Sequence, residues 1–320
     1  MAKSIDKIQS VGILGAGLMG HGIAQVFSLK GFKVQIYDSN SDAIQTLFER
    51  IRSNLETLSA LSMSTPEDID NCLSGIKPCE KLSEACHDVE LVIEAVSEDM
   101  TLKKELYQAV EKNVDPETII CSNTSAFSIT ELSEALEHKD RFIGTHFWNP
   151  PHVIPAVEVI KGKHTSPQIF ETVLQVIKNV GKEPVKVLKD VPGFLGNRLQ
   201  HAMWREAISL AENEVASPED IDKSVQYGFG LRLASMGPLK TADLAGLDLT
   251  FNVHNYLFPY LEDTHEPSSL LRRMGEKKQL GVKTGQGFYS WPQERIGAVK
   301  KRRDTTLLHI IKQMFATTQD

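Results

Sequence analysis

Residues 8–38, IQSVGILGAGLMGHGIAQVFSLKGFKVQIYD, contain the pattern that decides the fold of the N-terminal half. Apolar residues 8–14 predict a short strand, residues 21–30 predict a helix, and residues 33–37 predict a second strand. The first strand and the helix are joined by a G-x-G-x-x-G loop, which consists of Gly15, Ala16, Gly17, Leu18, Met19 and Gly20. In this context such a loop binds the pyrophosphate of a dinucleotide, because its glycines let the backbone approach the phosphates.

Asp38 ends the second predicted strand, where a carboxylate accepts hydrogen bonds from the adenosine ribose hydroxyls of a dinucleotide. Ser39 and Asn40 follow it, with no arginine beside them to bind a 2′-phosphate. The sequence therefore predicts NAD rather than NADP as the cofactor.

Strands and helices continue to alternate through the N-terminal half. Helices are expected over residues 41–62, from Ser64 onward and over residues 101–114, and strands over residues 89–96, 118–121, 142–146 and 184–188. This alternation predicts an α/β fold with a doubly wound parallel sheet, in which ligands bind beyond the carboxyl ends of the strands. Glu98, Ser125 and His146 lie at or just past such ends, so all three are candidate site residues.

The stretch GTHFWNPPHVIPAVEVIK, residues 144–161, carries a candidate acid–base pair. The proline after Asn149 biases that residue toward extended backbone, so the stretch predicts a strand end, a rigid turn and a second strand. Such a turn folds the chain back and brings Glu158 beside His146. A carboxylate on one ring nitrogen fixes the histidine tautomer and raises its basicity, as a general base for an alcohol proton requires.

Residues from about 193 onward predict an all-helical region. We expect a helix over residues 195–215, a helix start at residues 217–220, a glycine-rich turn at residues 283–289 and a final helix over residues 295–317. The chain should therefore form two domains, residues 1–190 for binding NAD and residues 191–320 for substrate and dimer contacts. The apolar helix faces exceed what such a bundle needs, which favours a homodimer.

Composition narrows the range of functions. The chain has 320 residues, which suggests two domains, and its 41% hydrophobic residues are typical of a globular protein. Its net charge of −7 argues against general binding to nucleic acid or to a membrane surface. No apolar run is long enough for a membrane span, and the first ten residues lack the apolar core of a signal peptide. We expect a cytoplasmic protein with no metal site and with four reduced cysteines, Cys72, Cys79, Cys86 and Cys121.

Seven ordered blocks of sequence carry a resemblance that spans essentially the whole chain. They are GAGLMGHGIAQ, VIEAVSED, SNTS, THFWNP with VEVIKG, VPGFLGNRL, GPLKTADLAGLD and KTGQGFY. With these blocks the chain resembles the 3-hydroxyacyl-CoA dehydrogenase family. The resemblance implies an N-terminal Rossmann domain, an all-helical dimerisation domain, and NAD-linked oxidation of a secondary alcohol to a ketone.

The resemblance also implies roles for individual residues. His146 matches the catalytic base of the family, and Glu158 matches the partner that orients it. Ser125 and Asn197 match residues that bond the reacting oxygen or stabilise the enolate-like product, although a helix cap or an interhelical hydrogen bond is an alternative role for Asn197. Further residues match positions that contact the cofactor in the family, namely Glu98, Lys103, Ser125, Lys161 and Lys283.

The sequence leaves the substrate open between an acyl-CoA and a small hydroxy acid. In acyl-CoA enzymes of the family, lysines near the second helix contact the CoA phosphates. The corresponding residues here, 48–65, contain only Arg50 and Arg52 as basic residues. In addition, residues 97–103, residues 231–237 and the tail beyond Tyr289 resemble the branches that act on small acids without CoA. These are the λ-crystallin (L-gulonate 3-dehydrogenase), carnitine dehydrogenase and pyridine-alcohol dehydrogenase branches. Arg232 is the candidate for binding a substrate carboxylate, with a dimer or surface contact as the alternative.

Two other classes of protein compete with this interpretation. A crystallin-like structural protein that kept only the fold has no need of four intact polar site residues, His146, Glu158, Ser125 and Asn197. The β-hydroxyacid dehydrogenase group shares a similar glycine loop but uses a catalytic lysine in its helical domain. The HFWNP segment fits that group poorly. The acyl-CoA alternative would place the chain in fatty acid metabolism.

Overall fold

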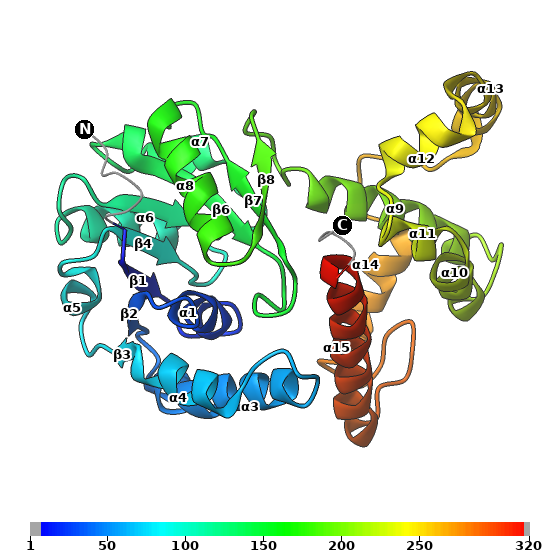
Figure 1. Ribbon diagram of the computed structural model, residues 1–320. Helices are drawn as coiled ribbons and strands as arrows, with labels where there is room; N and C mark the ends of the chain where they lie inside the picture. Colours follow the sequence, from blue (N-terminus) through cyan, green and yellow to red (C-terminus); the bar gives the residue numbers. More distant parts are fainter. Residues whose placement is uncertain (1–7, 317–320) are drawn as a thin grey trace. The chain divides into compact units, whose positions relative to one another are not determined.

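A computed structural model of the chain describes residues 8–316. The chain divides into two compact units, Met1–Asn197 and Arg198–Asp320 (Figure 1). None of the helices described between residues 8 and 316 is both long enough and apolar enough to cross a membrane.

Among the described residues, the first unit forms one eight-stranded sheet with the order β3-β2-β1-β4-β5-β6-β7-β8. The strands are β1 Ser10–Leu14, β2 Lys33–Tyr37, β3 Ile76–Pro78, β4 Leu91–Glu94, β5 Ile119–Ser122, β6 Phe142–Phe147, β7 Ala156–Ile160 and β8 Glu183–Val187. Neighbouring strands are parallel except for β6 and β7, which form an antiparallel pair. The order reverses at β1, between β2 and β4, and the glycine-rich loop follows β1 at this switch point, where α/β sheets bind ligands.

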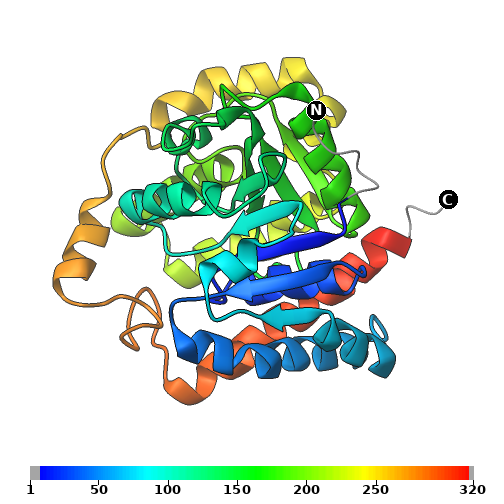
Figure 2. The ribbon, with the colours of Figure 1, turned by 90° about the vertical axis from the view of Figure 1, so that its left-hand side faces the viewer.

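Helices cover both faces of this sheet. Gly12 and Ile13 are neighbours in β1 and therefore point to opposite faces. A Cβ on Gly12 would meet the Ala85 carbonyl of α5 at 2.3 Å, whereas Ile13 lies near Gly20, the first residue of α1. Figure 1 shows α1 and α5 on opposite sides of β1, and Figure 2 views the sheet from the α5 side. The helices of this unit are α1 Gly20–Ser28, α2 Ser41–Gln45, α3 Leu47–Ser59, α4 Pro66–Ser74, α5 Leu82–Cys86, α6 Met100–Glu111, α7 Ile129–Ser133, the short η2 Lys139–Arg141 and α8 Pro167–Asn179.

The structure differs from the sequence prediction in several elements of the first unit. The helix expected over residues 41–62 is broken at Thr46, whose ψ of 0° ends α2 and whose hydroxyl donates to the Asp42 carbonyl. The break lets α3 bury Leu47 and Ile51, while Phe48 remains 36% exposed. Strand β3 and helices α5 and α7 were not predicted, because three to five residues are too few to show a period. Helix α8, with 13 residues, was also not predicted, although Ser166 caps it and Pro167 stands in its first turn.

The second unit is helical, as predicted. Between residues 198 and 316 the structure contains no β-strand, only isolated bridges in the predicted glycine-rich turn, Gly281 to Gln286 and Gln286 to Ser290. Ser217 caps α10 as the sequence indicates, since its side chain accepts from the Asp220 amide. The helices are α9 Gly196–Glu212, which begins in the first unit, α10 Pro218–Ser224, η3 Val225–Phe229, α11 Gly230–Leu233, α12 Pro238–Ala245, α13 Leu247–Leu257, η4 Phe258–Tyr260, α14 Ser269–Glu276 and α15 Gln293–Ala316.

Candidate functional site

The antiparallel pair of strands β6 and β7 brings the predicted histidine and carboxylate together. His146 and Glu158 are direct partners in the register, so their side chains leave the same face of the sheet side by side. The Nδ1 atom of His146 lies 2.8 Å from Glu158 Oε2, and both residues are buried. The expectation that the turn folds Glu158 back onto His146 is therefore confirmed.

The second carboxylate oxygen of Glu158 is also bound. Oε1 accepts hydrogen bonds of 2.9 Å from the backbone amides of Leu195 and Gly196, at the start of α9. Burial alone would raise the pKa of Glu158, but the hydrogen bonds from His146, Gly196 and Leu195 lower it below its usual value. Because an ionised carboxylate only accepts hydrogen bonds, the Nδ1 atom of His146 carries the hydrogen, and Nε2 is left as a proton acceptor.

Aromatic rings enclose this pair. The ring centroids of Trp148 and Phe194 lie 5.2 and 5.9 Å from that of His146. The Trp148 ring reaches so far over the start of α9 that a Cβ on Gly196 would lie 2.1 Å from it. Glycine is therefore required at this position, and the rings limit the freedom of the imidazole to rotate.

The glycine-rich loop has the geometry that a dinucleotide requires. Gly15 has a φ of +101°, and a Cβ there would lie 2.5 Å from the Ala95 carbonyl. A Cβ on Gly20 would lie 1.7 Å from the Gly15 carbonyl, so only glycine allows this close packing of loop and helix. A Cβ on Gly17, by contrast, would meet nothing within 4 Å. The loop therefore packs tightly at both ends and has open space beside Gly17 at its centre.

Asp38 and Arg50 hold this loop from its protein side. Asp38 accepts from the Ala16 amide at 2.6 Å and from the Asn40 amide at 2.8 Å. Arg50, on α3, donates to the carbonyls of Ala16 at 2.8 Å and Gly17 at 3.1 Å. Arg50 is one of only two basic residues in residues 48–65, the region whose counterpart in acyl-CoA enzymes of the family is expected to contact the CoA phosphates. Its guanidinium faces the glycine-rich loop.

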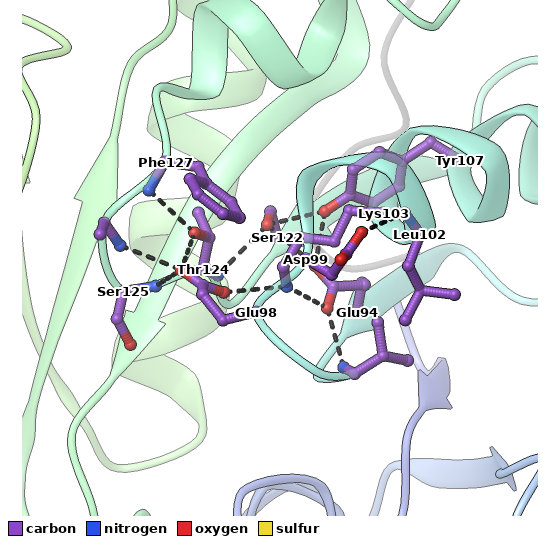
Figure 3. A network of polar contacts seen from close by, with 12 residues as sticks. Glu94, Glu98, Asp99, Leu102, Lys103, Tyr107, Ser122, Thr124, Ser125 and Phe127 are labelled. Carbon is purple, nitrogen blue, oxygen red and sulfur yellow. Dashed lines mark hydrogen bonds and ion pairs between the residues drawn. The ribbon is translucent and has the colours of Figure 1, made fainter. Parts of the chain in front are cut away.

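A buried polar network lies at the carboxyl ends of β4 and β5 (Figure 3). Its centre is Glu94, which accepts from Lys103 Nζ at 2.6 Å and the Val96 amide at 2.8 Å, and from the hydroxyls of Tyr107 at 2.5 Å and Ser122 at 2.9 Å. The side chains of Glu94 and Lys103 are almost fully inaccessible to solvent. Because four donors surround the carboxylate, its burial is compensated.

Lys103 connects this centre to the loop that carries Ser125. Its ammonium group lies 3.3 Å from Glu98 Oε2, while Glu98 Oε1 accepts from the Thr124 hydroxyl at 2.5 Å and the Ser125 amide at 2.9 Å. Burial would raise the pKa of Glu98, but the Thr124 hydrogen bond and the charge of Lys103 lower it. Asn197 donates from its side chain to the Ser125 carbonyl at 2.7 Å, which fixes the loop from its other end.

The remaining predicted residues lie in different places. Lys103 lies in the buried network, where its contacts are protein carboxylates. Lys161 directly follows β7, and its amide donates to the Val187 carbonyl. Lys283 and Arg232 belong to the second unit, the former in the glycine-rich turn and the latter in α11. Among residues 8–316 no cluster of three or more histidine, cysteine or acidic side chains could hold a metal ion.

Sequence reasoning missed Glu94, Tyr107 and Ser122. Glu94 lies inside the predicted strand 89–96 and Ser122 directly follows the predicted strand 118–121, and neither position by itself indicates a buried network. A signal was present in α6, where Lys103 and Tyr107 are four residues apart and therefore share the helix face that also carries Val110. A lysine on a buried helix face requires a carboxylate partner, which the preceding strand supplies.

Comparisons with known proteins give the family. Residues 10–191 match the model of the 3-hydroxyacyl-CoA dehydrogenase NAD binding domain, and residues 193–291 match that of the 3-hydroxyacyl-CoA dehydrogenase C-terminal domain. A 5-formyl-3-hydroxy-2-methylpyridine 4-carboxylate 5-dehydrogenase from Mesorhizobium japonicum is 34% identical over 307 residues, which cover 95% of this chain and 97% of the relative.

Two solved structures support the same assignment. One is a 5-formyl-3-hydroxy-2-methylpyridine 4-carboxylic acid 5-dehydrogenase, an NAD+-dependent dismutase, with a TM-score of 0.90, 32% identity and coverage of 95% of this chain and 98% of that one. The other is the (S)-3-hydroxybutyryl-CoA dehydrogenase of Ralstonia eutropha, with a TM-score of 0.75, 36% identity and coverage of 90% of this chain and 100% of that one. The chain therefore belongs to the 3-hydroxyacyl-CoA dehydrogenase family and is an NAD-dependent oxidoreductase that acts on CH–OH groups.

Proposed function

We propose that this chain oxidises a small, carboxylate-bearing alcohol that lacks CoA, and that His146 is the general base. NAD, when bound, accepts the hydride that leaves the carbinol carbon. The alcohol proton passes to His146 Nε2, because Nδ1 already donates to Glu158. Glu158 stabilises the imidazolium that forms, and its contacts with the start of α9 keep it in place.

The residues around Ser125 support a role in holding the reacting oxygen. Ser125 is exposed at the carboxyl end of β5, and its loop is fixed by Glu98 and Asn197. A hydroxyl on a fixed loop is a preorganised dipole for the oxygen on which charge develops. We propose that residues 15–20, Asp38, Glu98 and Lys161, all within residues 1–190, bind the cofactor, and that Lys103 acts on it through Glu98. Lys283, from residues 191–320, is a further proposed cofactor contact.

The observation that carries the choice of substrate is the direction of Arg50. Its guanidinium donates to the loop carbonyls of Ala16 and Gly17 and to the Ala43 carbonyl, so it is not available to the phosphates of CoA. Arg52 is then the single remaining basic residue of residues 48–65. Each phosphate contact that CoA would lose costs about 1.5–3 kcal/mol. The full-length similarity to a dehydrogenase of a pyridine carboxylate supports the same choice. Arg232 is the proposed partner of the substrate carboxylate.

A substrate panel tests this proposal. The values of kcat/KM would be compared for 3-hydroxybutyryl-CoA, free 3-hydroxybutyrate, gulonate, carnitine and hydroxymethyl- and formyl-pyridine carboxylates, with NAD in each case. We expect a free carboxylate to be the best substrate. A preference for the CoA thioester of about a hundredfold, equivalent to about 2.7 kcal/mol, would contradict the proposal and favour the acyl-CoA alternative. The absence of turnover with every compound would favour a crystallin-like structural role.

We further propose a homodimer formed by residues 191–320. Apolar side chains are exposed along α12 and α13, including Leu239 at 83% and Leu244 at 75%. Exposed apolar surface on this scale usually marks an interface, and twofold pairing is the commonest arrangement. Light scattering should give a dimer for the wild type and a monomer for Leu244→Lys. A wild-type monomer at micromolar concentration would contradict this proposal.

A further inference from the structure

Arg50 is placed to organise the glycine-rich loop. The residue lies near the start of α3, and its guanidinium points toward the loop between β1 and α1. Four of its hydrogen bonds go to carbonyl oxygens. The acceptors are Ala16 at 2.8 Å, Gly17 at 3.1 Å, Ala43 at 2.6 Å and Thr46 at 3.3 Å.

The direction of the loop peptides follows from these contacts. The peptides that join Ala16 to Gly17 and Gly17 to Leu18 are trans, so each N–H points away from its C=O. Because Arg50 binds both carbonyls, the amides of Gly17 and Leu18 are turned to the opposite side. A Cβ on Gly17 would meet nothing within 4 Å, so there is open space beside this part of the loop.

Ala16 is held at both of its ends. Its amide donates to Asp38, and its carbonyl accepts from Arg50, so the peptide planes on either side of it have little freedom to turn. Gly17 is held further by His21, whose Nδ1 lies 2.7 Å from the Gly17 carbonyl. A glycine-rich loop is otherwise the part of a βαβ unit with the most conformational freedom to lose on binding.

We propose that Arg50 is a positioning residue for the cofactor, which fixes the amides of Gly17 and Leu18 toward the pyrophosphate without touching it. This inference rests on the proposed binding of NAD by the loop. A cation on the carbonyl side also polarises both peptides, so that their amides bind an anion more strongly. Methionine would keep much of the aliphatic stem but remove the donors, and lysine would keep the charge but lose the planar fork that reaches several carbonyls.

The test is ligand binding to the full-length protein, independent of any substrate. Dissociation constants for NADH, ADP-ribose and adenosine would be measured for the wild type, Arg50→Met, Arg50→Lys and the matched control Arg52→Met, an exposed arginine on the same helix. We expect Arg50→Met to weaken NADH and ADP-ribose by about tenfold, equivalent to about 1.4 kcal/mol. Adenosine, which has no pyrophosphate, should bind unchanged, Arg50→Lys should be intermediate, and Arg52→Met should equal the wild type.

Two outcomes would overturn the inference. Unchanged NADH affinity in Arg50→Met would show that the loop needs no arginine. An equal loss for adenosine would show that the whole site had collapsed, and if Arg50→Met does not fold, Arg50→Lys decides by the same comparison. In turnover by Arg50→Met, the KM for NAD should rise while kcat stays close to the wild-type value. If the proposed substrate class were wrong, the dissociation constants of NADH and ADP-ribose would not be affected.

Discussion

The β6–β7 strand pair and the network around Glu94 each bury a carboxylate beside a basic side chain, but they are built differently. His146 and Glu158 meet because they are partners in a single strand register. Glu94, Lys103 and Ser122 come from three different elements, β4, α6 and β5. The strand pair leaves one nitrogen, Nε2 of His146, as a proton acceptor, whereas every oxygen of Glu94 is occupied by protein donors.

This difference indicates what each region does. A catalytic base needs a lone pair that no protein donor occupies, and in the proposed function Nε2 of His146 supplies it. The network has no such group, and its contacts lead through Lys103 to Glu98 and the Ser125 loop. We therefore expect changes in the strand pair to affect turnover most, and changes in the network to affect stability first.

The largest effect is expected from His146→Ala. Loss of the general base should lower kcat by roughly 10²- to 10⁴-fold. NADH affinity should remain near that of the wild type, because the glycine-rich loop is untouched. Steady-state kinetics together with NADH titration checks this, and a fall in kcat of less than about fivefold would remove the strand pair from the chemistry.

Lys103→Met tests the network in the same way. The change leaves Glu94 buried without its cation, which should cost about 3–5 kcal/mol of unfolding free energy. The neighbouring Lys104→Met is the matched control, since Lys104 makes only a partly exposed ion pair with Glu131 at 3.6 Å and should cost at most about 1 kcal/mol. Urea unfolding compares the two, and equal losses would mean that the network does not stabilise the fold.

Tyr107→Phe should have a smaller effect. It removes one donor to Glu94 and leaves three, at a cost of about 1–3 kcal/mol. A double-mutant cycle with Ser122→Ala should show coupling between the two hydroxyls, because Tyr107 also contacts Ser122 at 2.7 Å. Strict additivity of the two losses would argue that these hydroxyls act independently.

The smallest expected effect is on the free energy of unfolding at acid pH. The folded-state pKa of Glu158 lies below its usual value of 4.5, so the unfolded chain binds more protons in this range. Its contribution to stability is therefore fully present above the unfolded pKa and is lost as the pH falls through the folded pKa. The difference in unfolding free energy between wild type and Glu158→Gln should shrink as the pH falls below about 5. If the difference instead grew as the pH falls, folding would raise the pKa of Glu158, which would contradict the lowered pKa assigned to it.

The sequence predicted the regions in which local patterns agree with tertiary structure. The glycine-rich unit and the β6–β7 turn were predicted because period, turn residues and strand ends all pointed to one arrangement, and the structure confirms them. The order of all eight strands could not be read from local pattern, because β3 has only three residues. Thr46 was missed because a threonine inside an apolar period does not by itself predict a helix break.

Polar contacts between distant elements were the hardest to foresee. Arg50 was recognised only as a basic residue of residues 48–65, and its reach to the glycine-rich loop depends on how α3 packs against α1. Lys103 matched a cofactor-contacting position, yet its carboxylate partners are Glu94 and Glu98. Such contacts depend on side-chain direction across packed elements, which periodicity does not encode.

The most direct test of the central claim is the kcat of Glu158→Gln. The glutamine keeps the shape of the side chain, but its one oxygen cannot serve both His146 and the amides of Leu195 and Gly196. If its NH₂ group faces His146, Nδ1 becomes the acceptor and Nε2 carries the hydrogen, which is the wrong tautomer for a base. We predict a kcat lower by roughly a hundredfold or more, with NADH affinity unchanged and with the exposed Glu171→Gln equal to wild type. A kcat within about threefold of the wild type would contradict the account, because the pair would then not be a catalytic unit.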